Sequence, residues 1–364
     1  MNTPSFHDNW STLLRFLPDN WEQEAYTQKA LMRRREIKSP EVLLRVLLIH
    51  LAEGLSLRST STWAAQAGLC KLNDSALFHR LKASQEWFRW LALRLREQLE
   101  FPDTPNQYLS NFRVRLVDAS VISEPGSTGS DWRLHYSINL HNFYCDSFEI
   151  TDCKVGERLE RFSIQQDDLI LADRTYCKRS GISHVFNNGG QVLIRFHSTS
   201  LPLETYRGSV FDVLHNVAKL DVGEIGDYDV YITDENDRRI KGRICAIKKS
   251  KEAAEKEIKR IKAAASRKGR QVKPETYEFA KYIIVFTTMN RHKLKKEEVL
   301  HLYRSRWQVE LAFKRMKSIL DLGHLPKKDP VACKAWLYGK MFVALLVERI
   351  HREADCFSPW GYPL

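Results

Sequence analysis

Four side chains near the C-terminal end of the chain have types and spacing suited to chemistry on a phosphate group. Tyr303, Arg306, Glu310 and Lys317 stand at offsets of 0, 3, 7 and 14 in the stretch YRSRWQVELAFKRMK. At about 100° per residue they fall within roughly a 60° arc, so we predict one helix that carries all four on a single polar face. A carboxylate held among a phenol, a guanidinium and an ammonium could act beside a phosphate whose charge the two cations neutralise.

A second face of the same predicted helix is apolar and is the natural core face. Its members recur at helical spacing: Leu302, Val309, Phe313, Met316 and Leu320. An amphipathic surface helix needs only this apolar face. The ordinary alternative for the polar face is a pattern of exposed ion pairs, which would carry no chemistry.

Two aspartates are predicted to end β-strands upstream of this helix. The stretch FRVRLVDAS predicts a strand that ends at Asp118, and DLILADRTY predicts a buried strand that ends at Asp173. Between and after them the patterns predict the order β-β-β-α-β-α-β. Two-metal phosphodiester chemistry requires carboxylates that hold ions about 3.5–4 Å apart, and Mg²⁺ prefers such oxygen ligands. An aspartate at a strand end is more commonly a turn or cap residue, which is the alternative for each.

Taken together, these elements resemble the IS4 family of bacterial insertion-sequence transposases, whose signature is Y-x2-R-x3-E-x6-K. The stretch Asp173-Arg174-Thr175-Tyr176 resembles the D-R-x-Y element of that family, in which glycine commonly stands where this chain has Thr175. The stretches VRLVDAS and GERLERF also look familial. The resemblance covers roughly residues 111 to 325.

This resemblance implies an α/β fold: a ribonuclease H-like catalytic core interrupted by a mostly β insertion domain and preceded by an all-α N-terminal domain. We place the N-terminal domain at residues 1–110 and the first part of the core at 111–197. The insertion, with a basic helix, then spans 198–280, and the second part of the core with C-terminal helices spans 281–364.

The resemblance also implies a function, a DDE transposase that cleaves transposon ends and transfers strands into target DNA. Asp118, Asp173 and Glu310 would then be the catalytic residues that bind two Mg²⁺ ions, for which Mn²⁺ substitutes. Tyr303, Arg306, Lys317 and Arg174 would contact DNA. The partners would be double-stranded DNA, as terminal inverted repeats and as target, and a second copy of the chain in a homodimer assembled on DNA.

Composition favours a nucleic-acid partner independently of the motifs. The chain has 57 Lys and Arg against 45 Asp and Glu, a net charge of +12 and a pI near 9.3, and cations that neutralise phosphates release counterions. The seven cysteines form no C-x-x-C pair and are interpreted as reduced thiols. We found no apolar run long enough to span a membrane and no secretory signal, so we expect a cytoplasmic bacterial protein associated with the nucleoid through DNA.

Two further segments are candidates for DNA contact. In the N-terminal region, Ser39 is predicted to cap a helix that Gly54 ends, and the stretch STSTWAAQAGLCKLNDSALFHRLKAS is typical of helix-turn-helix, although any helical bundle can contain such a turn. Arg80 and Lys82 would then face phosphates. After a predicted hairpin through DENDRR, residues 248–270 predict a solvated basic helix whose DNA-contacting side chains would be Lys256, Lys259 and Lys262.

Other candidates and other functions remain open on the sequence. His135 follows the first acid but is more simply a packed histidine. Tyr282, Phe286 and Trp307 could stack on a flipped base, although burial in the core is the simpler use of all three. The rival functions are a ribonuclease H-like nuclease without strand transfer and a domesticated DNA-binding protein that retains the fold.

Overall fold

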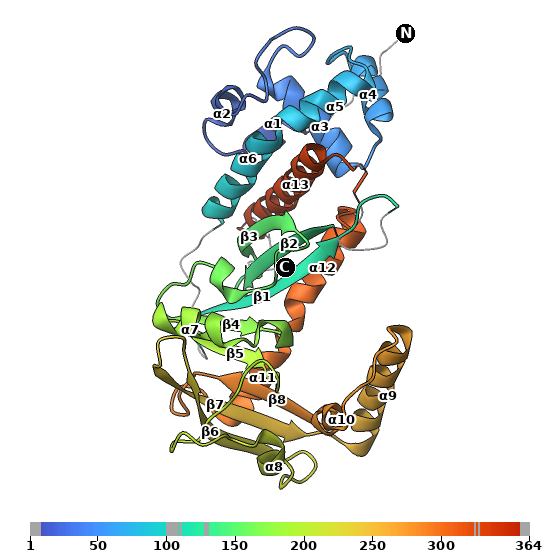
Figure 1. Ribbon diagram of the computed structural model, residues 1–364. Helices are drawn as coiled ribbons and strands as arrows, with labels where there is room; N and C mark the ends of the chain where they lie inside the picture. Colours follow the sequence, from blue (N-terminus) through green and yellow to red (C-terminus); the bar gives the residue numbers. More distant parts are fainter. Residues whose placement is uncertain are drawn as a thin grey trace.

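The computed structural model describes residues 9–99, 109, 111–126, 131–323, 325–326 and 328–356. Figure 1 shows a helical part at one end, a twisted sheet in the middle and at the other end, and a long C-terminal helix between them. Residue 110, at which the predicted N-terminal domain ends, lies outside the described residues. The structure therefore combines α and β layers, as the sequence patterns predicted.

The N-terminal part is entirely helical within its described residues. Its helices are α1 (Trp10–Leu14), α2 (Trp21–Thr27), α3 (Pro40–Ala52), α4 (Leu57–Gln66), α5 (Asp74–Ala83) and α6 (Gln85–Gln98). The predicted cap of α3 is confirmed, because the Ser39 hydroxyl accepts a hydrogen bond from the Val42 amide at 3.2 Å. The predicted helix, turn and helix are also confirmed: Gly68 adopts φ +68° after α4, and the Asn73 side chain caps α5.

One mixed sheet of eight strands forms the rest of the framework, in the order β3-β2-β1-β4-β5-β8-β7-β6. The strands are β1 (Arg113–Ile122), β2 (Trp132–Asn139), β3 (Cys145–Asp152), β4 (Asp168–Ala172), β5 (Gln191–Arg195), β6 (Ile225–Thr233), β7 (Arg239–Lys248) and β8 (Tyr282–Thr287). β1, β4 and β5 are parallel to one another, and every other pairing is antiparallel. The predicted strands and their order are confirmed in this first part of the sheet, and α7 is the helix predicted between the last two of them.

The segments between the strands are short helices and loops. They include the 3₁₀ turns η1 (Leu159–Arg161) and η2 (Arg174–Tyr176) and the helices α7 (Arg179–Asn187), α8 (Val213–Val217), α9 (Lys251–Arg267) and α10 (Pro274–Ala280). The helices α11 (Lys296–Arg304), α12 (Trp307–Ile319) and α13 (Pro330–Cys356) follow the last strand. The short helix predicted in VGERLERF is therefore a single 3₁₀ turn.

The strands of the predicted insertion join the core sheet. The predicted hairpin is confirmed as β6 and β7, and β7 pairs with β8, which in turn pairs with β5. Strands from residues 198–280 thus extend the core sheet by antiparallel pairing and do not form a separate sheet. The helix α9 instead stands away from the sheet (Figure 1), and its packing partner is the short helix α10.

The helix α13 is a core element that joins the two parts of the protein. It packs against α6, α3 and α5 on one side and β3 on the other. Residues Pro330–Glu353 are long and apolar enough to cross a membrane, with 67% of the most apolar window buried in the protein. Lys334 and Lys340 interrupt this stretch, which is why the sequence showed no uninterrupted apolar run there. Burial lowers the pKa of Lys340 to about 8 and raises that of Glu348 to about 7.

A buried ionic network fixes the start of β1 against β4. The Asp168 carboxylate, with no exposed side-chain surface, accepts hydrogen bonds from Arg113 Nε at 2.6 Å and from Arg115 Nη1 at 3.0 Å. Arg115 also pairs with Asp146, near the start of β3, at 2.8 Å. Removing one member of such a network leaves an uncompensated buried charge. The network therefore strongly favours this register of the two strands.

Candidate active site

The two predicted aspartates lie on neighbouring parallel strands. Val117 of β1 is in register with Ala172 of β4, so the residues that follow, Asp118 and Asp173, come side by side. β4 ends at Ala172, one residue before the predicted end, and Asp173 Oδ1 caps η2 by accepting the Thr175 amide at 2.7 Å. The predicted end of β1 at Asp118 is wrong: pairing with β2 carries the strand on to Ile122.

The predicted single helix is in fact two helices. Tyr303 lies in the last turn of α11, Arg306 precedes α12, and Glu310 and Lys317 are in α12. The junction is a tight turn, in which the Arg306 amide donates to the Tyr303 carbonyl at 3.1 Å. In such a three-residue turn, side chains three positions apart eclipse one another. The turn therefore keeps Tyr303 and Arg306 aligned although the regular helix is broken.

The predicted apolar face is confirmed and it places α12 over the strand that carries Asp118. Val309, Phe313 and Met316 are buried. The Phe313 ring lies 5.6 Å from the Tyr136 ring, measured between centroids. Because Tyr136 is the cross-strand partner of Asp118, this contact brings the helix directly above the first acid.

Arg306 lies between two of the three predicted acids. Its Nη1 is 3.7 Å from Asp118 Oδ2, and its Nη2 donates a short hydrogen bond to Glu310 Oε1. The guanidinium is largely covered, with 17% of its side chain exposed, whereas 55% of the Glu310 side chain is exposed. One cation thus holds an acid from β1 and an acid from α12 together, while Lys317 lies exposed farther along the helix.

The electrostatics of the site are those of crowded, partly buried acids. Burial raises the pKa of Asp118 to about 7, the Ala119 amide lowers it, and the charge of Asp173 raises it further. Burial also raises the pKa of Tyr303 to about 12, against the charge of Arg306. A bound cation would relieve the repulsion between neighbouring carboxylates.

The side chains fit a divalent metal in donor type. Within the described residues, no three carboxylate, imidazole or thiolate groups are arranged to hold one ion together, and Arg306 separates Asp118 from Glu310. The convergence of all three acids on one metal therefore stays a prediction. The fit rests on their hard oxygen donors and on the buried Tyr176 hydroxyl, for which the described residues provide no hydrogen-bond partner. Asp118, Asp173 and Glu310 are the residues that would hold the metal.

A broad groove adjoins this site. It encloses about 1150 Å³ and runs from Tyr303, Arg306 and Trp307 to Arg195 on β5, over apolar side chains of the sheet. Trp307, predicted to be buried, is 50% exposed here, while Tyr282 and Phe286 are buried as expected. Trp307 is the first residue of α12 and lines the groove.

His135 is a packed residue of β2. It is fully buried and its Nε2 lies 3.1 Å from the Thr151 hydroxyl, so it is held between two strands. Burial lowers its pKa to about 4, and the charge of Arg161 lowers it further. We therefore interpret His135 as a packed histidine, the simpler of the two alternatives that the sequence left open.

The predicted DNA-contacting residues have different surroundings. Arg174 is exposed immediately after Asp173, and Arg80 is half-buried on α5. Lys82 pairs with Asp329 at 2.8 Å, just before α13, so it helps to hold α5 in place. On α9, the three predicted lysines are exposed: Lys256, Lys259 and Lys262.

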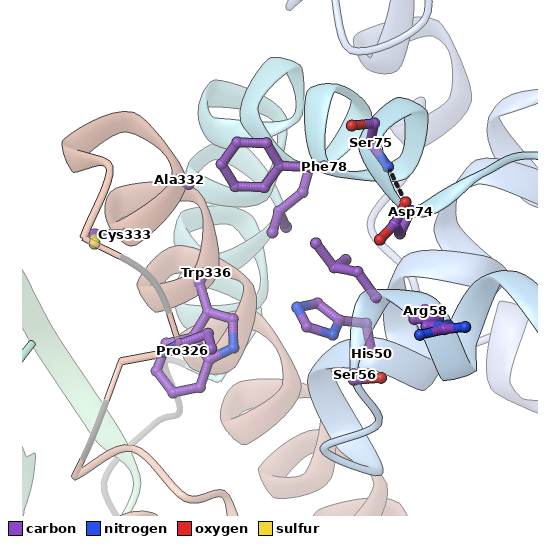
Figure 2. A pocket seen from close by; sticks show the side chains of 12 residues that line it. His50, Ser56, Arg58, Asp74, Ser75, Phe78, Pro326, Ala332, Cys333 and Trp336 are labelled. Carbon is purple, nitrogen blue, oxygen red and sulfur yellow. Dashed lines mark hydrogen bonds between the residues drawn. The ribbon is translucent and has the colours of Figure 1, made fainter. Parts of the chain in front are cut away.

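A smaller cavity of about 370 Å³ lies beside α5. Figure 2 shows it between His50, Arg58 and Asp74 from the N-terminal helices and Trp336 from α13. Asp74 Oδ1 accepts the Ser75 amide at 2.9 Å on its rim. The cavity belongs to the junction of the predicted helix-turn-helix with the C-terminal helix.

Two residues near the site were given no role from the sequence. Arg195 ends β5. Its pKa is lowered to about 10, mainly by burial; the charge of Tyr303 raises the pKa and that of Arg174 lowers it. Glu157 lies within electrostatic range of Asp118 and Asp173. Glu157 belongs to the stretch GERLERF, which looked familial but carried no functional signal. Only the sheet order places Arg195 near the site.

A mixed sheet with acids on two neighbouring parallel strands, and a third acid on a helix packed across them, is an arrangement suited to metal-dependent phosphodiester chemistry. Comparison with known proteins agrees: residues 110–346 match the family described as Transposase DDE domain. The chain belongs to this family. The expected ribonuclease H-like fold is consistent with that match and with the eight-stranded mixed sheet.

Individual relatives support the same assignment. The chain is 34% identical over 361 residues to the transposase for insertion sequence element IS421 of Escherichia coli, covering 97% of this chain and 96% of that protein. It is also 34% identical over 360 residues to the putative transposase InsL of element IS186A from Escherichia coli strain K12, with the same coverage. The transposase for element IS231F of Bacillus thuringiensis is 22% identical over 276 residues, 66% of this chain and 57% of that protein. The predicted resemblance to insertion-sequence transposases of the IS4 type is confirmed, and the chain is a DDE transposase.

Proposed function

We propose that this transposase cuts DNA at both termini of its insertion sequence and joins the released 3′-OH ends to target DNA. The observation that carries the proposal is the placement of Arg306 against both Asp118 and Glu310, next to Asp173. The guanidinium of Arg306 supplies positive charge and a planar set of donors beside the three acids, where a phosphate at a metal site would lie.

Each side chain would have a distinct part in this reaction. Asp118, Asp173 and Glu310 would hold two Mg²⁺ ions, or Mn²⁺ in their place, which activate water and stabilise the leaving oxygen when bound. Arg306 would leave its contacts with the acids to bind a phosphate beside the scissile bond through its planar fork. Tyr303 would donate to a phosphate oxygen, and Lys317 would add a point charge farther along the same face.

DNA would be held outside the site by dispersed charges. The exposed lysines of α9 support backbone contact there, and Arg174 lies between that region and the acids. Arg80 on α5 supports DNA contact by the N-terminal helices. Lys82 pairs with Asp329, so its first role is to hold α5 in the fold. Joining two ends to one target requires two active sites, so we propose a homodimer assembled on DNA.

Two assays test the proposal. The full chain is incubated with duplexes that carry the element's own terminal repeats, with and without Mg²⁺, and nicking is measured. A pre-cleaved end with a free 3′-OH is then supplied with target plasmid, and joined product is measured. Joining supports the transposase. Nicking without joining would favour the nuclease, and binding without nicking would favour the domesticated DNA-binding protein.

A further inference from the structure

A fourth carboxylate, that of Glu157, lies within electrostatic range of Asp118 and Asp173. Glu157, in the connection from β3 to η1, is half-buried. Arg133 of β2 approaches it from one side, with 3.5 Å between Nε and Oε1. On the other side, Lys178 donates from Nζ to the Glu157 carbonyl at 3.4 Å. Since Lys178 follows η2, this contact ties the Glu157 segment to the turn that begins at Asp173.

Glu157 is surrounded by other carboxylates as well as by its ion-pair partner Arg133. Burial raises the pKa of the Glu157 carboxyl, Arg133 lowers it, and the charge of Asp173 raises it again. The charge of Glu157 in turn raises the pKa of Asp118. Three carboxylates in mutual electrostatic range repel one another unless a cation is bound among them.

The Tyr176 hydroxyl gives an independent indication that a ligand belongs here. The side chain is 1% exposed, and the described residues offer its hydroxyl no hydrogen-bond partner. Burial raises the pKa of this phenol most; the charges of Glu157, Asp118 and Asp173 raise it further, in that order of size, and the charge of Arg133 lowers it. A buried hydroxyl left unsatisfied costs free energy. Water drawn in by a cation at these acids would satisfy it.

We propose that Glu157 is a positioning residue of the catalytic site, which accepts hydrogen bonds from the water around the bound divalent cation, with the Tyr176 hydroxyl beside it. This inference rests on the proposed function. Arg133 keeps the Glu157 carboxylate charged and in place, because it pairs with Oε1 and also donates to the Val155 carbonyl. Groups that hydrogen-bond to the ligands of a metal ion influence the affinity for that metal, because they hold the ligands in place.

The test is Mn²⁺ binding, followed through the paramagnetic resonance signal of free Mn²⁺, with the full chain on its terminal-repeat duplex. Glu157→Gln should weaken Mn²⁺ binding about 10- to 100-fold, while the midpoint of thermal unfolding stays near that of the wild type. Tyr176→Phe should weaken it less, and the double variant should lose less than the product of the two single effects, because both groups contact the same water. Glu160→Gln, three residues on and exposed, is the matched control and should bind Mn²⁺ normally.

The outcomes separate the roles. If Glu157→Gln folds and binds Mn²⁺ like the wild type, Glu157 only neutralises Arg133 and the proposal is overturned. If Glu157→Gln does not fold, Glu157→Asp decides: it keeps the charge but withdraws the carboxylate, so weakened Mn²⁺ binding supports the proposal and unchanged binding overturns it. Asp173→Asn serves as reference. A wild-type chain that neither binds Mn²⁺ nor nicks would overturn the proposed function itself, and with it this role.

Discussion

The helices α12 and α9 both carry many charges, yet the protein holds them in different ways. α12 buries Val309, Phe313 and Met316 against the sheet, whereas the only residue that α9 buries along its 17 described residues is Ala254. Packing therefore fixes the position of α12 against the sheet. The helix α9 is held mainly through the short helix α10, where Lys262 lies over the Tyr277 ring.

The ion pairs of the two helices show the same contrast. Arg306 on the sheet side is 17% exposed and reaches an acid of another element, Asp118. Arg260 on α9 is 76% exposed and pairs with Glu257, three residues earlier on its own helix. An exposed pair of this kind contributes about 0–1 kcal/mol. A charge can serve chemistry at a defined atom only where the fold fixes it, so we assign reaction chemistry to α12 and general attraction of DNA to α9.

The largest expected effect tests whether the acids beneath α12 serve a reaction at all. Asp173→Asn removes a charge that would bind metal but keeps a group that can cap η2, so nicking in Mg²⁺ should be abolished while DNA binding persists. Gel-based nicking and fluorescence anisotropy on one preparation measure both. Residual nicking near the wild-type rate would remove Asp173 from the site.

The next effect concerns the packing that fixes α12. Phe313→Ala should lower the free energy of unfolding by about 3–5 kcal/mol, because it leaves a cavity against Tyr136. Ile258→Ala on α9, where the side chain is only half-buried, should cost much less. Urea denaturation of both variants measures the difference. Equal destabilisation would mean that α9 is packed as firmly as α12.

A smaller effect isolates the charge on α12 from its packing. Arg306→Ala should unfold like the wild type but cut more slowly by about 10- to 150-fold, if a charge-assisted hydrogen bond worth roughly 1.5–3 kcal/mol acts only in the transition state. Arg306→Lys should restore this only in part, since an ammonium lacks the planar fork. Single-turnover cleavage beside thermal unfolding is the measurement. A variant that cuts at the normal rate would show that the polar face is an ordinary surface pattern of ion pairs.

The smallest effect is expected on α9. Replacing Lys256, Lys259 and Lys262 together by Gln should lower affinity for all DNA sequences alike. It should also flatten the dependence of log affinity on log salt concentration by up to about 0.9 for each phosphate that α9 no longer neutralises. Binding titrations at several salt concentrations, with specific and unrelated duplexes, measure both quantities. Unchanged affinity and slope would show that α9 is merely solvated.

The sequence by itself determined the features that depend on local patterns. The apolar face of α12, the Ser39 cap, the hairpin of β6 and β7 and, to within one residue, the end of β4 were predicted correctly. Each depends on residues within a few positions of one another, through helical or strand periodicity, caps and turns. The transposase signature is also local, although it spans two helices, because the turn between α11 and α12 keeps Tyr303 and Arg306 aligned.

The tertiary structure alone decided the features that depend on distant partners. β1 continues past Asp118 because β2 pairs with it, and the strands of residues 198–280 join the core sheet because β8 bridges β5 and β7. The placement of Arg306 between two acids, and of Glu157 within electrostatic range of Asp118, requires α12, β1 and the β3–η1 loop to meet. Strand ends, ion pairs and burial are set by whichever segment lies opposite, and no pattern within one segment contains that information.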